Sequence, residues 1–389
     1  MKEGCRPNFA TRYLAGIAIL LGGSCLLFCR ATEPRVQVCE DYGLAADNLP
    51  TANSGNSNLC HLVREAFLGT NLHSLLIEHH GRIVTEAYGS GADSPINERY
   101  GIGNPFAADV DFDAETLHDI RSISKSVVAL LYGVALEERL VPPIKAPAID
   151  SFPEIGAFAP GIDHIRIKDL LDMTVGLEWD EGGLPNDETS LFYKADQIGY
   201  FFDRGFASTS RTKFHYNSGA TAMLATILVR GTGRSLSAYA KEKLFDPMEI
   251  RRWEWVRDYH DRELSFTGLR LLPRDMIKLG RLVQDNGRFK EKQIIPLQWM
   301  AMVKTPQIST GYSLASSDLT YGFQWWSGIQ RRGRDGTFWL AGFGNGGQRI
   351  YIVPSLELIV VFTAGEYGDH DINEREQRIF ESIVIAIGE

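Results

Sequence analysis

The amino-acid sequence predicts an α+β fold in which both ends of the chain build one antiparallel sheet. Segments with the alternation and β-branched composition of strands lie near the start and in the last third of the chain. Segments with helical periodicity fill the region between them. Strands and helices do not alternate along the chain, which argues against a parallel sheet of βαβ units. We therefore expect helices on the faces of the sheet and a mostly helical region inserted in the middle.

The first predicted strands form a hairpin. Residues 74–78 and 83–88 are rich in aliphatic residues and alternate in polarity, and residues 79–82 supply the turn between them. Residues 89–118 are rich in Gly, Asp and Pro and are typical of a loop. At Ser122 the pattern changes to that of a helix with a broad apolar stripe.

The remaining elements follow from helical periodicity and from the residues that end helices. Pro273 is typical of a helix start, and Gly231 and Gly233 are typical of positions after a helix end. We expect helices over residues 165–177, 219–230, 235–245 and 273–285, strands over residues 348–353 and 358–363, and a closing helix over residues 373–387.

The composition is that of a globular protein. Of the 389 residues, 44% are hydrophobic and 23% are charged, which excludes an intrinsically disordered chain. The net charge is −9, and the sequence contains no basic patch with interleaved aromatic residues. Nucleic acid is therefore not an expected partner.

The N-terminal residues have the pattern of a secretory signal. An apolar run spans residues 13–29, basic residues precede it, and the small residue Ala31 follows it. At about 16 residues the run is short for a membrane span, which needs about 20. We expect residues 1–31 to be a signal peptide, and an uncleaved membrane anchor stays open as the alternative. In either case we expect the protein to be exported. It would be periplasmic or secreted after cleavage, or anchored facing the periplasm without it.

Two cysteines, Cys39 and Cys60, remain after residue 31. In an exported chain such a pair is expected to form one disulfide, which here would enclose a polar segment. Two free thiols in a reducing compartment are the alternative. Neither cysteine has a nearby His or acidic residue in metal-ligand spacing, so no metal site is expected. We assign residues 32–70 to an N-terminal extension and residues 71–389 to the main domain.

The first motif that carries chemistry is the pair Ser122 and Lys125. Serine and lysine three residues apart lie on one face of a helix. If Ser122 opens the helix, the helix dipole favours negative charge beside it, and burial of Lys125 would lower its pKa and make the amine a usable base. The spacing alone also fits an ordinary serine that caps a helix. The same spacing of serine and lysine recurs at Ser210 and Lys213, which precede no apolar helix.

Two further segments stand out between this helix and the C-terminus. Tyr216 directly precedes the predicted helix over residues 219–230, and we interpret His215 as structural because alternation places it opposite Tyr216. Residues 342–348 are rich in glycine and run straight into a strand. Their glycines match a dinucleotide-binding spacing, but that motif needs a helix after it, so we reject a nucleotide site. Glycines that enter an edge strand would instead let a substrate carbonyl approach the backbone closely.

The order of Ser-x-x-Lys, a tyrosine motif and a glycine-rich strand resembles the serine β-lactamase and penicillin-binding-protein superfamily. The resemblance is to its class C-like branch, which includes esterases, D-amino-acid peptidases and 6-aminohexanoate-dimer hydrolase. It covers residues 71–389 and implies a β-lactamase/transpeptidase-like fold. The supporting stretches are residues 117–122, 170–179, 216–221, 321–326 and 344–348.

The resemblance implies a role for each matching residue. Ser122 corresponds to the acylated nucleophile, Lys125 to its proton-transfer partner, and Tyr216 to the residue that moves protons to and from the leaving group. The backbone N–H groups of Ser122 and Gln348 correspond to the oxyanion hole. We expect the neighbouring Lys125 ammonium to favour the phenolate of Tyr216 and so to lower its pKa.

Two departures from the family pattern concern the substrate. Ser218 stands where true class C β-lactamases usually have Asn. Asn345, Gly346 and Gly347 stand where the family has K-T-G or H-x-G, so Asn345 replaces a basic residue that usually meets a substrate carboxylate. Both departures argue against strong β-lactam hydrolysis and against peptidase action on a free C-terminal carboxylate.

The implied function is an exported serine hydrolase that cleaves a small or medium ester or amide through an acyl-enzyme, without a metal or an organic cofactor. The alternatives are a β-lactamase or D,D-peptidase, and a non-catalytic penicillin-binding-like sensor. The expected partner is a small-molecule substrate, and attachment to a membrane through residues 13–29 stays open. Trp179, Trp325 and Trp326 are candidates for an apolar pocket wall, although core packing explains each of them equally well.

Overall fold

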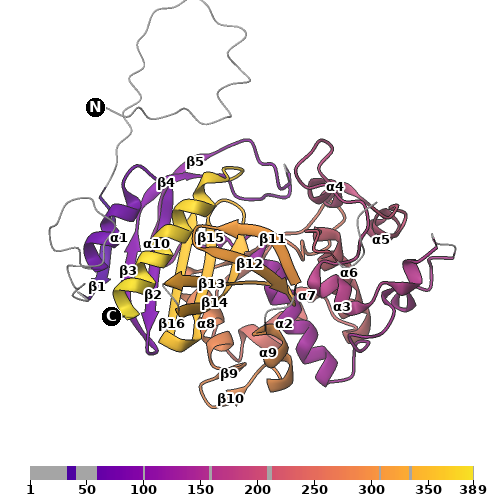
Figure 1. Cartoon of the computed structure of the whole chain (residues 1–389). Coiled ribbons are helices and arrows are strands. Elements are labelled where there is room, and N and C mark those ends of the chain that lie inside the picture. The colour runs from indigo at the N-terminus through magenta and orange to yellow at the C-terminus, as the bar shows by residue number, and fades with distance from the viewer. Residues whose placement is uncertain are drawn as a thin grey trace, which may run out of the picture.

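An antiparallel sheet of nine strands runs through the part of the chain that the structure describes (Figure 1). The computed structural model describes residues 33–40, 59–99, 101–156, 160–207, 213–305, 308–332 and 335–388. The strands of this sheet are β1 (Arg35–Cys39), β2 (Leu72–His79), β3 (Arg82–Tyr88), β11 (Ile308–Leu314), β12 (Ser317–Gly322), β13 (Trp325–Arg332), β14 (Asp335–Gly344), β15 (Gln348–Val353) and β16 (Leu358–Ala364). Their order is β1-β3-β2-β16-β15-β14-β13-β12-β11, so that β2 from the start of the chain lies beside β16 from its end.

The seam between β2 and β16 confirms the prediction that both ends of the chain build the sheet. Leu76 pairs with Val361 in antiparallel register. Nearby in the same seam, the hydroxyl groups of Ser74 and Thr363 lie 2.6 Å apart, although the two residues are 289 positions apart in the chain. These contacts join the two halves of the sheet into one layer.

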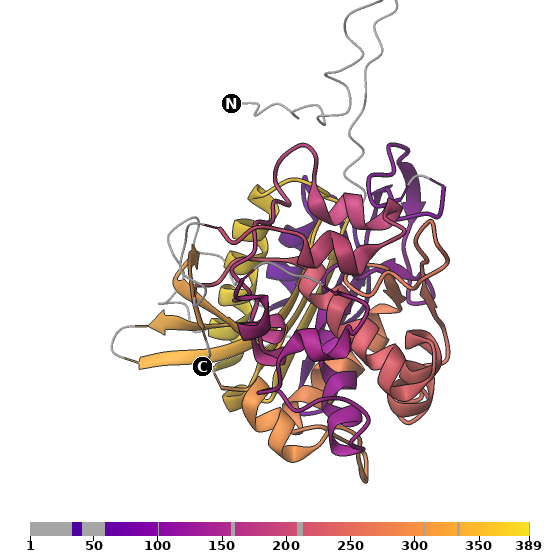
Figure 2. The ribbon, with the colours of Figure 1, turned by 90° about the vertical axis from the view of Figure 1, so that its right-hand side faces the viewer.

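Helices cover both faces of the sheet (Figures 1 and 2). They are α1 (Leu59–Phe67), α2 (Ile123–Glu137), α3 (Ile167–Asp172), α4 (Asp187–Tyr193), α5 (Gln197–Phe202), α6 (Ser218–Thr232), α7 (Leu236–Ala240), α8 (Pro273–Gln284), α9 (Leu297–Val303) and α10 (Asp371–Gly388). Because side chains alternate between the faces of a strand, neighbouring residues of β16 join different cores. Phe362 packs with Phe380 of α10 on one face, and Val361 packs with Ile277 of α8 on the other.

The predicted elements are mostly found at the predicted places. The hairpin, the helix after Ser122, the helices that became α6 and α8, the last two strands and the closing helix are all confirmed. The helix predicted over residues 165–177 is shorter, because Met173 adopts a left-handed conformation with φ 54° and ends α3. The helix predicted over residues 235–245 is divided into α7 and a wider helical turn over Lys241–Phe245.

The prediction of a plain loop over residues 89–118 is wrong in part. Outside the main sheet, the short strands are β4 (Ser90–Asp93), β5 (Ala108–Asp111), β6 (His118–Asp119), β7 (Trp253–Trp255), β8 (Leu269–Leu271), β9 (Arg288–Phe289) and β10 (Lys292–Gln293). Strands β4 and β5 pair with each other, and β6 pairs with β8, so backbone partners rather than local alternation make this segment extended. Because β6 lies just before Ser122, its pairing with β8 holds the chain that leads to the predicted nucleophile.

Helix α2 is buried on all sides, and not only along one stripe. Every residue from 123 to 135 is buried. At Gly133 a side chain would meet the ring of Trp299 at 2.4 Å, so glycine lets helix α9 pack closely against α2. A helix that is fixed on every side is a firm support for the side chains at its first turn.

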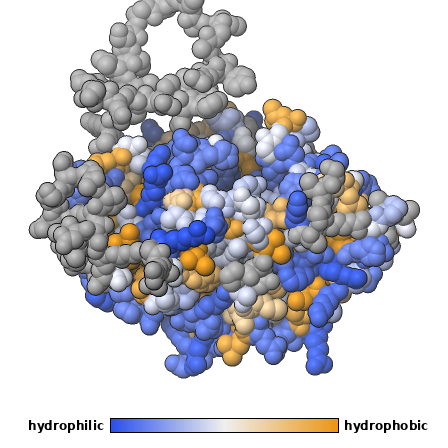
Figure 3. Space-filling model, in the orientation of Figure 1, coloured by the Kyte–Doolittle hydropathy of each residue, from blue (hydrophilic) through white to orange (hydrophobic). Residues whose placement is uncertain are grey.

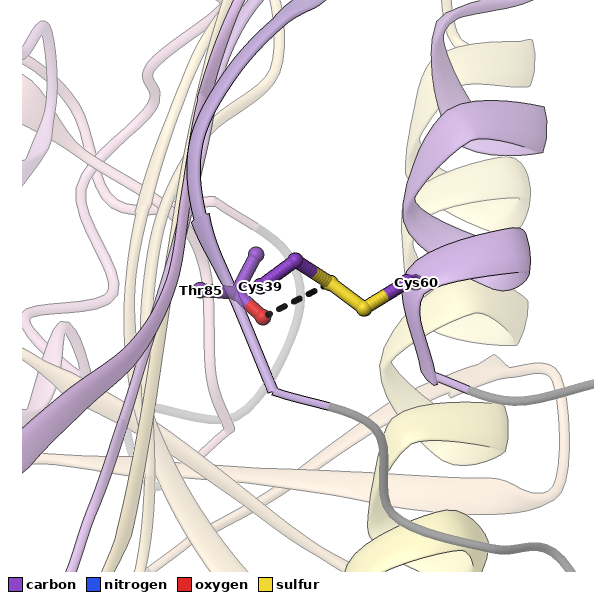
Figure 4. The surroundings of a disulfide bond; sticks show 3 residues. All are labelled: Cys39, Cys60 and Thr85. Atoms are coloured by element: carbon purple, nitrogen blue, oxygen red, sulfur yellow. Dashed lines mark hydrogen bonds between the residues drawn. A yellow bond between two sulfur atoms is a disulfide. The ribbon is translucent and has the colours of Figure 1, made fainter.

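The predicted disulfide between Cys39 and Cys60 is confirmed (Figure 4). It links the last residue of β1 to helix α1, with the two Cα atoms 5.7 Å apart. The hydroxyl of Thr85 on β3 contacts the Cys39 sulfur at 4.0 Å. The disulfide therefore joins the edge of the sheet to the helix that covers it.

The surface, the described helices and the N-terminal segment bear on the predicted signal peptide or membrane anchor. On the face shown in Figure 3, polar residues predominate and apolar ones are scattered among them. Within the described ranges, no helix has the length and apolar character that a bilayer crossing requires. The signal or anchor predicted for residues 1–31 lies outside the described residues.

The disulfide should stabilise the fold through the loop that it closes. Its cysteines are 21 positions apart, and the chain-entropy model gives about 3 kcal/mol for such a loop. We expect the double variant Cys39→Ser/Cys60→Ser to lose about 3 kcal/mol of unfolding free energy in urea denaturation. Wild-type protein reduced with dithiothreitol is the control and should lose the same amount; equal stability with and without the bond would contradict this prediction.

Candidate active site

Ser122 lies at a sharp turn just before the first residue of α2. Arg121, the preceding residue, has a left-handed backbone with φ 51°, a conformation that non-glycine residues rarely adopt and that is often found at functional sites. The Arg121 guanidinium is buried, lies 4.1 Å from the centre of the Tyr367 ring, and donates to the Ser94 carbonyl at 3.0 Å. These contacts hold the strained turn in place.

The side chain of Ser122 does not cap the helix. Ser122 makes no side-chain capping hydrogen bond, and its Oγ instead accepts one from Lys125 Nζ at 2.8 Å. The geometry thus distinguishes this serine from the ordinary helix cap that the spacing alone also allowed. It places a hydroxyl and an amine in direct contact at a helix N-terminus.

Lys125 is held from the other side by the inserted region. Its side chain is 1% exposed, and Nζ donates a second hydrogen bond to the Phe266 carbonyl at 2.9 Å. Phe266 lies shortly before β8, the strand that pairs with β6, so one small sheet positions both the serine turn and the lysine partner. The Oε1 atom of Glu188 lies 3.8 Å from Nζ.

Tyr216 completes the group of reactive side chains. It lies shortly before α6, and its ring centre is 5.0 Å from Lys125 Nζ. The Tyr216 ring stacks on Trp326 with the ring centres 6.0 Å apart. The neighbouring His215 donates its backbone N–H to the Met173 carbonyl at 2.8 Å. The three residues that the sequence predicted as reactive are therefore brought together.

The protonation of this group differs from the sequence-based prediction. Burial acts to lower the pKa of Lys125, but the charges of Tyr216, Glu188 and Glu181 outweigh it, so the pKa is raised. Burial raises the pKa of Tyr216, and the Lys125 ammonium offsets this only in part. Both predicted directions differ from these: for Lys125 the neighbouring charges outweigh burial, and for Tyr216 burial outweighs the ammonium.

The glycine-rich segment forms the tight turn between β14 and β15. Gly346 and Gly347 have φ 85° and 93°, which favour glycine, and a side chain at Gly346 would meet the Tyr367 ring at 2.4 Å. The strand that follows the turn agrees with the rejection of a nucleotide site. The prediction of an edge strand was wrong, because β14 and β15 lie inside the sheet.

The neighbouring Gly344 makes room for the nucleophile turn. A side chain there would meet the Ile120 carbonyl oxygen at 2.4 Å. Gly344 also pairs with Gln348, the residue predicted to supply an oxyanion N–H. Ser122 and Gln348, the two predicted oxyanion residues, therefore flank one close backbone contact between α2 and the sheet.

The model of the beta-lactamase family matches residues 73–382. The chain belongs to the beta-lactamase family. This match supports a serine hydrolase function, and it covers the Ser122 turn, the glycine-rich turn and the sheet apart from β1 and the first residue of β2. A comparison with curated proteins found no match.

Solved structures show the same fold. A protein assigned as a 6-aminohexanoate-dimer hydrolase from Bacillus anthracis is 20% identical, with a TM-score of 0.65 over 89% of this chain and 90% of that one. A penicillin-binding protein homologue from Caulobacter crescentus is 14% identical, with a TM-score of 0.64 over 91% of this chain and 100% of that one. D-amino acid amidase from Ochrobactrum anthropi SV3 is 16% identical, with a TM-score of 0.59 over 84% and 98%.

Two positions depart from the usual pattern of the family, and both have local partners here. The Ser218 side chain is buried at the start of α6, and its hydroxyl donates to Glu188 at 3.3 Å. Asn345 is exposed, and its Oδ1 accepts the Gly368 N–H at 3.1 Å. The contact of Asn345 ties the glycine turn to the loop after β16. The predicted roles of both residues in substrate binding stay predictions.

The tryptophans predicted as pocket candidates differ in their surroundings. Trp325 and Trp179 are buried in the larger core, and the Trp179 indole N–H donates to Glu181 at 2.7 Å. Trp326 is only partly buried and lies against the Tyr216 ring. Of the three, Trp326 has the place that a wall beside the reactive group requires.

Gln324 supports the site, and the sequence analysis did not identify this role. Gln324 has a left-handed φ of 64°; its backbone carbonyl accepts from Ser126 Oγ of α2 at 2.7 Å, and its side-chain oxygen accepts from Thr221 of α6 at 2.8 Å. Its amide donates to the Leu170 carbonyl of α3 at 2.8 Å. Gln324 thus joins three helices to the sheet. Only its place in a stretch similar to the family marked it in the sequence.

The contact at Gly344 can be tested without touching a reactive side chain. Gly344→Ala should push the Ile120 carbonyl, and with it Ser122, away by about 1 Å, which can reduce a rate by about 100-fold. The measurement is the rate at which a fluorophosphonate probe labels Ser122. Gly103→Ala is the control, because nothing lies within 4 Å of a side chain at that exposed glycine. Equal labelling rates in both variants would contradict the prediction.

Proposed function

We propose that the protein is an exported serine hydrolase that cleaves an ester or amide bond through an acyl-enzyme on Ser122. One observation carries the proposal: the Ser122 hydroxyl contacts the Lys125 amine at 2.8 Å and does not cap its helix. A serine hydroxyl becomes a nucleophile when a neighbouring base takes its proton. Membership of the beta-lactamase family supports the same chemistry.

The proposed reaction has two halves. In the first, Ser122 Oγ attacks the substrate carbonyl while its proton passes to the Lys125 and Tyr216 couple. The backbone N–H groups of Ser122 and Gln348 stabilise the negative oxygen, and the couple then returns a proton to the leaving group. In the second half, water attacks the acyl group by the same route and releases Ser122. No metal or organic cofactor is needed for these steps.

The proposed substrate is a small or medium ester or amide without a carboxylate next to Asn345. The Asn345 side chain carries no charge, so it cannot form the charge-assisted pair that a lysine or arginine would form with a carboxylate. Trp326, which is partly buried beside Tyr216, is proposed as an apolar wall for the acyl or leaving group. A β-lactamase, a D,D-peptidase and a non-catalytic sensor would each give a different result in the tests below.

Export is part of the proposal. The disulfide between Cys39 and Cys60 is compatible with export, because such bonds persist in oxidising compartments. We propose that residues 1–31 direct the chain out of the cytoplasm. The mature protein is then periplasmic or secreted, or is anchored facing the periplasm if residues 13–29 stay attached.

The central test concerns Ser122. Wild-type protein should be labelled once by a fluorophosphonate probe, as seen by intact mass, and should hydrolyse members of a panel of p-nitrophenyl esters, D-amino-acid amides and nitrocefin. Ser122→Ala should abolish both reactions while the circular dichroism spectrum is unchanged. Labelling that persists in this variant would show that another serine reacts. A penicillin adduct that forms without any turnover would instead identify a sensor.

The second test concerns the charge at Asn345. Wild-type protein should prefer a neutral ester over an analogue that bears a carboxylate at the leaving-group end. Asn345→Lys should shift the ratio of the two kcat/KM values toward the anionic analogue by about 10-fold, the usual effect of one charged hydrogen bond. A wild-type enzyme that already favours the anionic analogue would contradict the role of Asn345 and favour the D,D-peptidase.

A further inference from the structure

A buried arginine lies directly beside the glycine-rich turn. Arg349, the second residue of β15, is 1% exposed. Its Nη1 atom donates to the Gly344 carbonyl at 2.7 Å and to the Gln348 carbonyl at 2.8 Å. Gly344 is the last residue of β14 and Gln348 is the first of β15, and the two pair across the strands. One charged group therefore bridges the two strand ends that the turn joins.

Helix α10 holds the guanidinium in this place. The Asn373 side-chain oxygen accepts a hydrogen bond from Arg349 Nη2, and Glu376 Oε2 lies 3.2 Å from Arg349 Nε. Both members of this ion pair are buried. A side chain at Gly347 would meet Glu376 Oε1 at 2.6 Å, so the carboxylate packs against the turn itself. The ion pair and the turn thus form one buried unit.

The face of the guanidinium is the first layer of a column of rings that ends at the reactive group. Its central carbon lies 4.6 Å from the centre of the Phe343 ring. Phe343 stacks on Trp326 with the ring centres 5.5 Å apart, and Trp326 stacks on Tyr216 at 6.0 Å. Arg349 therefore contacts the glycine-rich turn directly and reaches Tyr216 through two rings.

The turn needs a fixing contact because its backbone is permissive. Gly346 and Gly347 have no side chain that restricts φ and ψ, and glycine populates conformations that other residues avoid. A donor that stabilises an oxyanion is effective only when it is already in place, since it then needs no reorganisation during the reaction. Hydrogen bonds from a charged donor are about twice as strong as neutral ones, so a guanidinium is well suited to hold two carbonyl groups.

We propose that Arg349 is a positioning residue, which holds the glycine-rich turn in the shape that presents the Gln348 backbone N–H to the substrate oxyanion. This role rests on the proposed function, in which that N–H is one of the two donors. Arg349 acts through the carbonyl groups of Gly344 and Gln348, and not through contact with the substrate. The alternative is that its ion pair with Glu376 serves stability alone.

The two roles differ in the step that they affect. The oxyanion exists only in the transition state, so a displaced donor slows the chemical step and leaves ground-state binding unchanged. For Arg349→Gln, we expect the limiting rate of Ser122 labelling by a fluorophosphonate probe to fall about 100-fold. The probe concentration that gives half of this rate should stay close to the wild-type value. Arg349→Lys keeps a charged donor and should be labelled about 10-fold faster than Arg349→Gln.

Arg281→Gln is the matched control. Arg281 of α8 also donates to a buried acid, Glu78 of β2, from Nε at 2.9 Å. Glu78 pairs with Ile359 of β16, further from the glycine-rich turn than the partner of Arg349 on that strand. The control variant removes the charged partner of a buried carboxylate, as Arg349→Gln does, and should keep the wild-type labelling rate.

The experiment follows labelling of Ser122 by intact mass at several probe concentrations, and measures the unfolding free energy of each variant in urea. If Arg349→Gln fails to fold, the double variant Arg349→Gln/Glu376→Gln replaces it, because it removes both charges of the ion pair. A limiting rate equal to that of Arg281→Gln would overturn the proposal, as would a loss that lies wholly in the half-saturating concentration. Wild-type protein that is neither labelled nor active would overturn the proposed function instead.

Discussion

The burial of one ammonium group, that of Lys125, is the constraint on which the rest of the site depends. An isolated charge inside a protein is strongly unfavourable unless hydrogen bonds and opposite charges surround it. Lys125 finds these partners in three places: Ser122 on its own helix, the carbonyl of Phe266 before β8, and the acids around α4. These partners are far apart within residues 122–266, so the lysine finds all of them only when this part of the chain has folded around α2.

The parts of the site that could be predicted lie on short, continuous segments. Ser122 and Lys125 share one helical turn, and Tyr216 and the glycine turn each stand next to a regular element, so periodicity and family resemblance sufficed. Glu181 and Glu188 could not be found in this way, because they reach Lys125 through the folding of a loop with no periodicity. The charges around Lys125, those of Tyr216, Glu188 and Glu181, outweigh its burial and so reverse the expected lowering of its pKa.

In the fold, too, features that depend on one segment could be predicted, and features that depend on distant partners could not. The alternation of β15 and β16 and the apolar pattern of α2 were visible in the sequence, because each reflects burial of the element itself. The place of a strand within a sheet depends on its partners. For this reason β15, the strand that the glycines enter, was mistaken for an edge, and the short strands β4 to β6 were mistaken for loop. Glycines at 342 and 344 have the same cause: Gly344 leaves room for the backbone before α2, and Gly342 leaves room for the side chains of Ile123 and Ser126 within it.

The seam between Ser74 and Thr363 has a consequence for how the molecule folds. The residues that meet there are separated by 289 positions, and the inserted helices lie between them. Pairing across such a distance closes a very long loop at a cost in chain entropy, and chains dominated by non-local pairing fold slowly. The glycine turn is carried by strands next to this seam, whereas Ser122 is carried by a helix encoded far earlier. The two halves of the proposed active site thus meet through contacts that are distant in the chain, the kind of contact that slows folding.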